Sequence, residues 1–291
     1  MRNWIFATLV ALLIVSLALV GCGPTAAPEP TQAPAATEAP APEPTEPPAA
    51  EEPAEEEEPA AEDTAFKVGM VSDVGGVDDA SFNETTWAGL EMAQEELGVH
   101  SQFIESQAQA DYEKNITEFA EQGYDQIITV GFLLGDATAK MAEVYPDTEF
   151  AIIDFAYDPP IPNVAGIVFN VDEAAFPIGY LAAGWADIQD PDDPQVGWVG
   201  GMQIPPVEQF IVAYEAGVDY YNQQKGTDVQ AKGVYVGNFE APDDGKIQGF
   251  SLIDEGVDVI FGVGGKTGNG GLAAAKERGK WGVGVDVDQY F

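Results

Sequence analysis

Apolar segments of strand length alternate with helical patterns from residue 67 almost to the end of the chain. The expected strands cover residues 67–71, 102–104, 126–130, 150–154, 165–169, 196–199, 233–236, 257–263 and 281–285. The expected helices cover residues 82–96, 112–121, 137–144, 174–186, 206–222, 245–254 and 271–278. Strands this uniformly apolar are typical of parallel sheets that are covered on both faces. The alternation therefore predicts an α/β fold of two doubly wound lobes that share one cleft, the first over 64–170 and the second over 171–291.

The first predicted unit is a strand, a glycine-bearing turn and a helix, within residues 67–98. Ser81 and Glu84 have the spacing of a capping box, which predicts that the helix begins at Ser81. Open α/β sheets bind ligands beyond the carboxyl ends of their strands. Phe82 and Asn83, in the first helical turn, are therefore expected at the mouth of the cleft.

The N-terminus has the pattern of an export signal. Arg2 precedes an apolar stretch over residues 5–20, which is short for a membrane span of about 20 apolar residues. A single membrane span is the alternative. The sequence LVGC at 19–22 resembles the lipobox of bacterial lipoproteins, and Cys22 is the only cysteine of the chain. We expect a signal peptide over 1–21, a lipidated Cys22, and a protein anchored to the extracytoplasmic side of the cell membrane.

Residues 23–63 consist mainly of Pro, Ala, Thr and Glu, and they include no aromatic and no basic residue. A segment of this composition buries too little apolar surface to offset the entropy lost on ordering. We therefore expect 22–63 to form a disordered linker between the lipid and the folded part. A tail that binds a partner is the alternative.

The folded part is strongly acidic. Twelve of the 50 acidic residues lie in 23–63, and Arg2 is the only basic residue before residue 64, so the remainder carries 38 acidic against 10 basic residues. Such a charge repels nucleic acids and anionic lipid surfaces, and it argues against a polyanionic substrate. We expect no nucleic-acid partner.

Three aspartates stand at the ends of predicted strands, namely Asp73, Asp154 and Asp286. Carboxylates at these places point toward the ligand crevice of a doubly wound sheet, where they accept hydrogen bonds from hydroxyl and ring N–H groups. Helix capping or a solvated loop is the commoner role of any single aspartate. A metal site is the competing interpretation of Asp286 with Asp288, but no histidine stands near them in the sequence.

Two phenylalanines lie near the starts of predicted helices in different lobes. Phe82 precedes the apolar stripe of its helix, so it either faces the cleft or packs in the core. Phe210 falls on an apolar stripe, which favours a core position. Facing each other across the cleft, the two rings would sandwich a planar ligand, and such stacking contributes about 0.5–1.5 kcal/mol beyond burial.

Residues 262–271 read GVGGKTGNGG. A phosphate-binding P-loop would require glycine at the position of Ile260. Gly268, Gly270 and Ala273 satisfy the dinucleotide pattern G-x-G-x-x-A, but no acidic residue closes a strand about 20 residues further in the expected frame. A nucleotide-dependent enzyme is therefore the less favoured alternative. We expect these glycines to let backbone N–H groups approach a ligand closely.

No set of catalytic residues is recognisable in the sequence. His100 is the only histidine, and neither a Ser-His-Asp nor a Cys-His arrangement can be assembled. We predict a binding protein rather than an enzyme, with no cofactor and no metal.

Five segments carry a resemblance to a known family: DVGGVDDASFNETTWAGL, FAIID, VGWVGGMQIPPVEQFIVAYEAGV, the glycine pair 264–265 and GVDVDQ. Together they resemble the basic membrane lipoprotein family, whose members include purine-nucleoside receptors of the PnrA/TmpC kind. The resemblance spans residues 66–289. It implies a hinged type I periplasmic-binding-protein fold and a lipid-anchored protein that captures a nucleoside for an ABC importer and its membrane permease. A sensory receptor of the same fold for another small polar ligand is the alternative.

The resemblance also implies ligand contacts, residue by residue. The residues that would sandwich the base are Phe82 and Phe210. Those that would bond its polar edge are Asn83 and Asp154. Those that would hold the ribose are Asp73, the backbone of Gly264 and Gly265, and Asp286.

The chain departs from the family pattern at two places. Ala241 stands where members usually carry an aspartate, so a ribose contact is missing unless Glu240 or Asp243 supplies it. Lys266 makes the usual G-G-T-G one residue longer. Family members also continue well past the GVDVDQ segment, so we expect this chain to be a fragment whose first lobe is incomplete.

Overall fold

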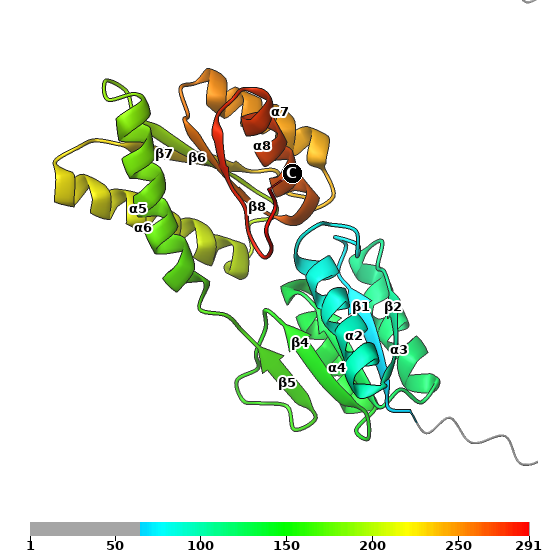
Figure 1. Cartoon of the computed structure of the whole chain (residues 1–291). Coiled ribbons are helices and arrows are strands. Elements are labelled where there is room, and N and C mark those ends of the chain that lie inside the picture. Colours follow the sequence, from blue (N-terminus) through cyan, green and yellow to red (C-terminus); the bar gives the residue numbers. More distant parts are fainter. Residues whose placement is uncertain (1–64, 291) are drawn as a thin grey trace, which may run out of the picture. The chain divides into compact units, whose positions relative to one another are not determined.

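The computed structural model describes residues 65–290 (Figure 1). The predicted signal peptide, Cys22 and the linker lie outside the described residues. Two parallel sheets, each with helices on it, make up the described part. Among the described residues, no helix is both long enough and apolar enough to cross a bilayer.

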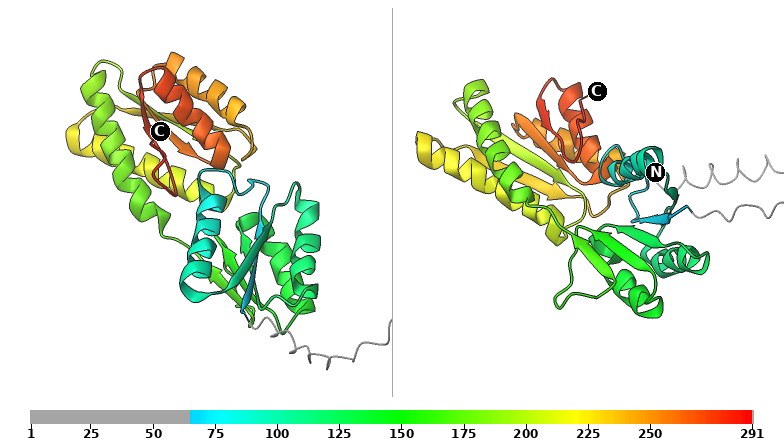
Figure 2. Two further views of the ribbon diagram at one scale, coloured as in Figure 1. Left: turned by 45° about the vertical axis from the view of Figure 1, so that its right-hand side comes forward. Right: turned by 60° about the horizontal axis from the view of Figure 1, so that its bottom comes forward.

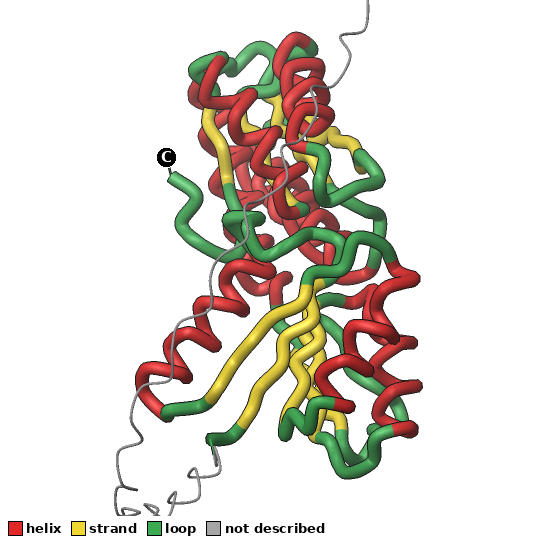
Figure 3. Tube along the Cα trace, turned by 90° about the vertical axis from the view of Figure 1, so that its right-hand side faces the viewer, coloured by secondary structure: helices red, strands yellow, loops and turns green. Residues whose placement is uncertain are grey.

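The first sheet has five parallel strands in the order β2-β1-β3-β4-β5. Its strands are β1 (Lys67–Ser72), β2 (His100–Ile104), β3 (Gln126–Val130), β4 (Glu149–Ile153) and β5 (Val164–Ile167). Its helices are α2 (Phe82–Leu97), α3 (Tyr112–Glu121) and α4 (Gly135–Val144), with 3-10 turns at Gln109–Asp111 and Phe132–Leu134. The strands lie side by side in Figure 3. Ile116 and Phe119 of α3 belong to one buried apolar cluster with strand residues of this sheet. Leu90 of α2 belongs to a second such cluster with other strand residues.

The second sheet has four parallel strands in the order β7-β6-β8-β9. Its strands are β6 (Gln195–Gly200), β7 (Gln230–Tyr235), β8 (Val259–Val263) and β9 (Trp281–Val283). Its helices are α5 (Val171–Gln189), α6 (Pro205–Lys225), α7 (Pro242–Asp254) and α8 (Gly265–Glu277). The pair α5 and α6 covers one face of this sheet, and the pair α7 and α8 covers the other (Figures 1 and 2). The predicted parallel α/β fold is confirmed.

Glycines set the close packing of α5 on α6. A Cβ atom at Gly179 of α5 would lie 1.9 Å from the carbonyl oxygen of Tyr214, and one at Gly217 of α6 would lie 2.0 Å from that of Phe176. Real Cβ atoms do not approach backbone this closely. Any side chain at either position would therefore push the two helices apart.

Helix α8 begins at Gly265, six residues before the predicted start, so the sequence prediction was wrong there. Of the glycines within 262–271, those from Gly265 to Gly271 lie inside the helix. A Cβ atom at Gly270 would lie 2.1 Å from the carbonyl oxygen of Pro242, at the start of α7. Glycine at this position permits the two helices to touch, a packing role that outweighs its low helix propensity.

Candidate functional site

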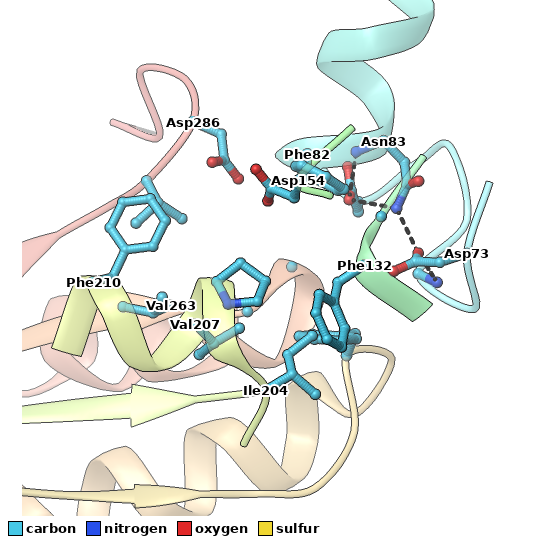
Figure 4. A pocket seen from close by; sticks show the side chains of 18 residues that line it. Asp73, Phe82, Asn83, Phe132, Asp154, Ile204, Val207, Phe210, Val263 and Asp286 are labelled. Atoms are coloured by element: carbon cyan, nitrogen blue, oxygen red, sulfur yellow. Dashed lines mark hydrogen bonds between the residues drawn. The ribbon is translucent and has the colours of Figure 1, made fainter. Parts of the chain in front are cut away.

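A pocket lies where the carboxyl ends of strands from both sheets come together (Figure 4). Its lining residues from the first sheet and its connections are Asp73, Gly75, Asp79, Phe82, Asn83, Gly131, Phe132 and Asp154. Those from the second are Ile204, Pro206, Val207, Phe210, Phe239, Val263, Gly264, Gly265, Val285 and Asp286. This is the place at which doubly wound sheets bind ligands.

All eight residues proposed from the sequence line this one pocket: Asp73, Phe82, Asn83, Asp154, Phe210, Gly264, Gly265 and Asp286. The first of them, Asp73, and the last, Asp286, lie more than 200 positions apart in the chain, so the fold has brought them together. Their contacts with a ligand stay predictions.

A network of buried polar groups fixes the loop between β1 and α2. One carboxylate oxygen of Asp73 accepts hydrogen bonds from the backbone N–H of Gly75 at 2.8 Å and from Asn83 Nδ2 at 3.0 Å. Asn83 Nδ2 also reaches Asp79 Oδ2 at 3.2 Å. These bonds hold the Asn83 amide and the Asp73 carboxylate in fixed orientations at the pocket wall.

Asp79 caps helix α2. Its carboxylate accepts hydrogen bonds from the backbone N–H groups of Ser81, Asn83 and Glu84, at 3.0, 3.0 and 3.1 Å. The predicted capping box was therefore wrong. Ser81 occupies the N-cap position, but its side chain accepts no hydrogen bond from the backbone N–H groups of the first turn. The carboxylate of Asp79, two residues earlier, satisfies the free N–H groups instead and places negative charge at the positive end of the helix.

Burial changes the acidity of Asp73. The residue is 6% exposed, and loss of solvent raises its pKa from 3.8 to about 6. The hydrogen bonds from Gly75 and Asn83 oppose this rise, whereas the neighbouring charges of Asp79 and Glu240 add to it. The site thus holds a carboxyl group whose charged form is disfavoured by burial.

Asp154 and Asp286 form a second acidic pair in the pocket. Burial raises the pKa of Asp154 to about 6, and the charge of Asp286 adds to the rise. Although Asp286 is exposed over much of its surface, its carboxylate is shielded from solvent, which raises its pKa as well; the hydrogen bond from Ser81 Oγ at 2.5 Å opposes this effect. Both residues have left-handed backbones, with φ of 62° and 68°. Strain of this kind is frequent at ligand sites.

Phe82 and Phe210 both line the pocket (Figure 4), and each is partly buried. Phe82 also packs against the cluster that includes Leu90, while Phe210 packs against the core of the second sheet, with its ring centroid 6.4 Å from that of Phe261. Each ring therefore serves both of the roles that the sequence left open: one part contacts the core and another part faces the pocket.

Two further aromatic residues, Phe132 and Phe239, line the pocket and were missed by the sequence analysis. Phe132 lies in the turn after β3, where its ring packs against Phe155 with centroids 5.3 Å apart. Phe239 follows β7 and is 8% exposed. The position of each just beyond a strand end was an available signal, the same signal that selected the aspartates.

The glycine pair 264–265 forms the pocket wall after β8. Gly264 has φ of 147°, and a Cβ atom there would lie 2.4 Å from the backbone nitrogen of Gly201. Gly265 has φ of 53°. A side chain at Gly264 would force the ends of β6 and β8 apart, so glycine is required for the shape of the wall.

The residues considered as substitutes for the missing aspartate at Ala241 do not line the pocket. Glu240 pairs instead with Lys266, and Asp243 is exposed in the first turn of α7. Among the residues that the structure describes, no group of three or more His, Cys, Asp or Glu side chains is arranged to hold a metal ion.

A family model described as "ABC transporter substrate-binding protein PnrA-like" matches residues 66–291. The chain belongs to this family, the Bmp family. Its fold is the type I fold of periplasmic solute-binding proteins, as the sequence resemblance implied.

Among its relatives, the chain is 34% identical over 237 residues to the CD4+ T-cell-stimulating antigen of Listeria monocytogenes, covering 77% of this chain and 64% of that protein. It is 30% identical over 240 residues to the ABC transporter nucleoside-binding protein BmpA of Lactococcus lactis, covering 78% and 66%. A crystal structure of a solute-binding protein of an ABC transporter system from Aeropyrum pernix is 37% identical, with a TM-score of 0.72 and coverage of 75% and 61%. The chain thus spans less than two thirds of the Listeria and Aeropyrum proteins.

Proposed function

We propose that the chain is the substrate-binding protein of an ABC importer and that it captures a nucleoside, with purine nucleosides preferred. The observation that carries this proposal is the composition of the pocket wall. Four aromatic rings and four aspartates line it, and none of its 18 residues is Lys, Arg or His. Flat aromatic faces suit a base, and carboxylates suit its N–H groups and the ribose hydroxyls.

The same wall disfavours phosphorylated ligands. A phosphate group would lie near Asp73, Asp79, Asp154 and Asp286 with no basic side chain in the lining to compensate its charge. The ligand is therefore a nucleoside rather than a nucleotide. The name of the Lactococcus lactis relative, a nucleoside-binding protein, supports the same ligand class.

In this proposal each predicted contact keeps its role. The rings of Phe82 and Phe210 hold the two faces of the base, and Asn83 with Asp154 bonds its edge. The ribose is held by Asp73, by the backbone at 264–265 and by Asp286.

The proposal extends to the membrane. Residues 1–21 are removed as a signal peptide, Cys22 is lipidated, and 22–63 tether lobes over 64–170 and 171–291 to the extracytoplasmic face. The ligand-bound form docks on the transporter's permease. The names of relatives as basic membrane proteins and lipoproteins support this location.

Isothermal titration calorimetry of the full chain tests the ligand class. Inosine, guanosine and adenosine should bind, cytidine and uridine should bind more weakly, and inosine 5′-phosphate should bind least. Free ribose separates base recognition from sugar recognition. Tight binding of the nucleotide, or binding of ribose as strong as that of inosine, would contradict the proposal.

A further inference from the structure

Lys266 joins two segments that come from different sheets. Its Nζ lies 2.5 Å from Asp78 Oδ1, in the loop after β1, and 3.0 Å from Glu240 Oε2, in the loop after β7. Lys266 is the residue that lengthens the family's G-G-T-G segment, and Glu240 directly precedes Ala241, the other departure from the family pattern. This ion cluster neighbours the pocket, because Gly265, which precedes Lys266 in the chain, lines the pocket wall.

The loop that contains Asp78 receives further bonds from the second sheet's side. Asn269 Nδ2 donates to the carbonyl oxygen of Asp79 at 2.9 Å, and Gln289 Nε2 donates to that of Ala80 at 3.1 Å. Ser81 Oγ donates to Asp286 Oδ2. Four consecutive residues, 78–81, are therefore each held by one residue of the other side. Lys266 makes the only ion pair among these four contacts.

Residues 78–81 directly precede two of the proposed ligand-binding residues in the chain. Phe82 and Asn83 follow Ser81 in the chain, and the Asp79 carboxylate bonds the backbone N–H of Asn83. A contact that fixes 78–81 therefore also fixes the first turn of α2, which carries both side chains into the pocket.

The side chains of the ion cluster are exposed enough for dissolved salt to screen their charges. The side chains of Lys266, Asp78 and Glu240 are 24%, 80% and 35% exposed. Lys266 lowers the pKa of Asp78 through its hydrogen bond and its charge. Exposed pairs of this kind are weakened by added salt, since the Debye length falls from about 10 Å at 0.1 M to about 3 Å at 1 M.

We propose that Lys266, Asp78 and Glu240 form an ionic latch that holds the pocket closed and makes ligand retention depend on ionic strength. Glu240, on the second sheet's side like Lys266, orients the lysine side chain. Asp78, on the first sheet's side, forms the ion pair that joins the two sides. The effect on nucleoside affinity rests on the proposed function, whereas the effect on closure does not.

The first test measures closure without ligand. Fluorescent dyes are attached at Met92→Cys and Ile247→Cys, two exposed positions on α2 and α7, in the full chain with Cys22→Ser. Lys266→Gln should lower the energy transfer between the dyes. In the protein that keeps Lys266, 0.5 M NaCl should lower this energy transfer as well. Lys246→Gln is the matched control, because Lys246 pairs with Glu277 at 2.6 Å within the second sheet's helices.

The second test measures inosine binding by calorimetry and stopped-flow. Lys266→Gln should weaken binding about two- to five-fold, mainly through faster dissociation, as expected for a partly exposed ion pair. Asp78→Asn should give a similar loss, and the double variant should lose no more than either single variant. Lys246→Gln should bind as the parent does.

Equal energy transfer in Lys266→Gln and the parent, or an equal drop in Lys246→Gln, would overturn the latch. So would additive losses in the double variant. A drop in energy transfer specific to Lys266→Gln, with no inosine binding by any variant, would leave the latch standing and refute the nucleoside assignment instead.

Discussion

The two sides of the pocket differ in chemistry. The first sheet's side contributes three carboxylates and an amide, from Asp73, Asp79, Asp154 and Asn83. The second sheet's side contributes mainly apolar groups, with Asp286 as its one charged residue. Its apolar members are Ile204, Pro206, Val207, Phe210, Phe239, Val263 and Val285.

The difference begins in the two loops that follow the first strand of each sheet. The loop between β1 and α2 is polar, and Asp73 and Asp79 cross-link it through hydrogen bonds to its own backbone. The turn between β6 and α6 is short and mostly apolar, and α6 begins with two prolines that need no N–H partner. One side is thus suited to orient the polar edges of a ligand, and the other to bury its rings.

Phe210→Ala should have the largest effect, because this ring belongs both to the apolar side and to the core around Phe261. We expect a loss of ~2–4 kcal/mol in the free energy of unfolding, by comparison with other Phe→Ala core changes, together with weaker inosine binding. Chemical denaturation and calorimetry measure the two effects. A variant of unchanged stability would show that Phe210 is not part of the core.

Phe82→Ala should separate the two effects. It should weaken inosine binding by roughly 1–3 kcal/mol while changing the melting temperature little, because only part of the ring packs on its own cluster. Phe66→Ala, at a phenylalanine that is 49% exposed, is the control. Unchanged affinity in Phe82→Ala would refute its stacking role.

Asp79→Ala should destabilise the polar side. Loss of the bonds to the N-terminus of α2 is expected to cost ~1–2 kcal/mol of unfolding free energy, as for other helix caps. Ser81→Ala should cost less, because it removes a single hydrogen bond, the one to Asp286, and no capping bond. If Asp79→Ala left the free energy of unfolding unchanged in urea denaturation, the assignment of the cap to Asp79 would be wrong.

Asp154→Asn should raise the free energy of unfolding at neutral pH and weaken inosine binding. Its pKa is raised to about 6, so the stability that comes from its protonated form is full below about pH 4 and is lost as the pH rises through 6. At pH 7 the variant should gain ~1 kcal/mol, less than the pKa shift alone would give because the side chain keeps some solvent contact, and it should bind inosine more weakly.

The gain should shrink toward pH 4, where the native carboxyl is already neutral. Asp147→Asn, at an exposed aspartate after α4, is the matched control and should show no such pH-dependent gain. A gain for Asp154→Asn that is equally large at pH 4 would mean that desolvation of the charge is not its cause.

The sequence predicted the sheets well because apolar runs mark buried parallel strands. The expected strand 126–130 coincides with β3, and the expected strand 67–71 ends one residue before β1 does. The strand ends then led to the pocket residues, since the carboxyl ends of parallel strands share one edge of a sheet. The fold could therefore be derived before any contact was known.

Contacts between distant segments could not be derived in this way. The glycines inside α8 disfavour a helix by propensity, and the close approach of Gly270 to α7 is visible only in the structure. The cap of α2 depended on which of several nearby polar side chains reached its N–H groups. Phe132 and Phe239 follow strand ends, as the aspartates do, but for an apolar residue that position does not separate a pocket wall from a core. Each of these features is decided by tertiary packing.

We propose that one flat ligand lies between Phe82 and Phe210, with its polar groups bound by carboxylates from both sides of the pocket. A crystal structure of the chain bound to inosine tests it most directly. We expect the base to be stacked between these two rings and the ribose hydroxyls to lie within hydrogen-bond distance of Asp73 and Asp286. A base that contacts neither ring, or a ribose directed away from the aspartates, would contradict it.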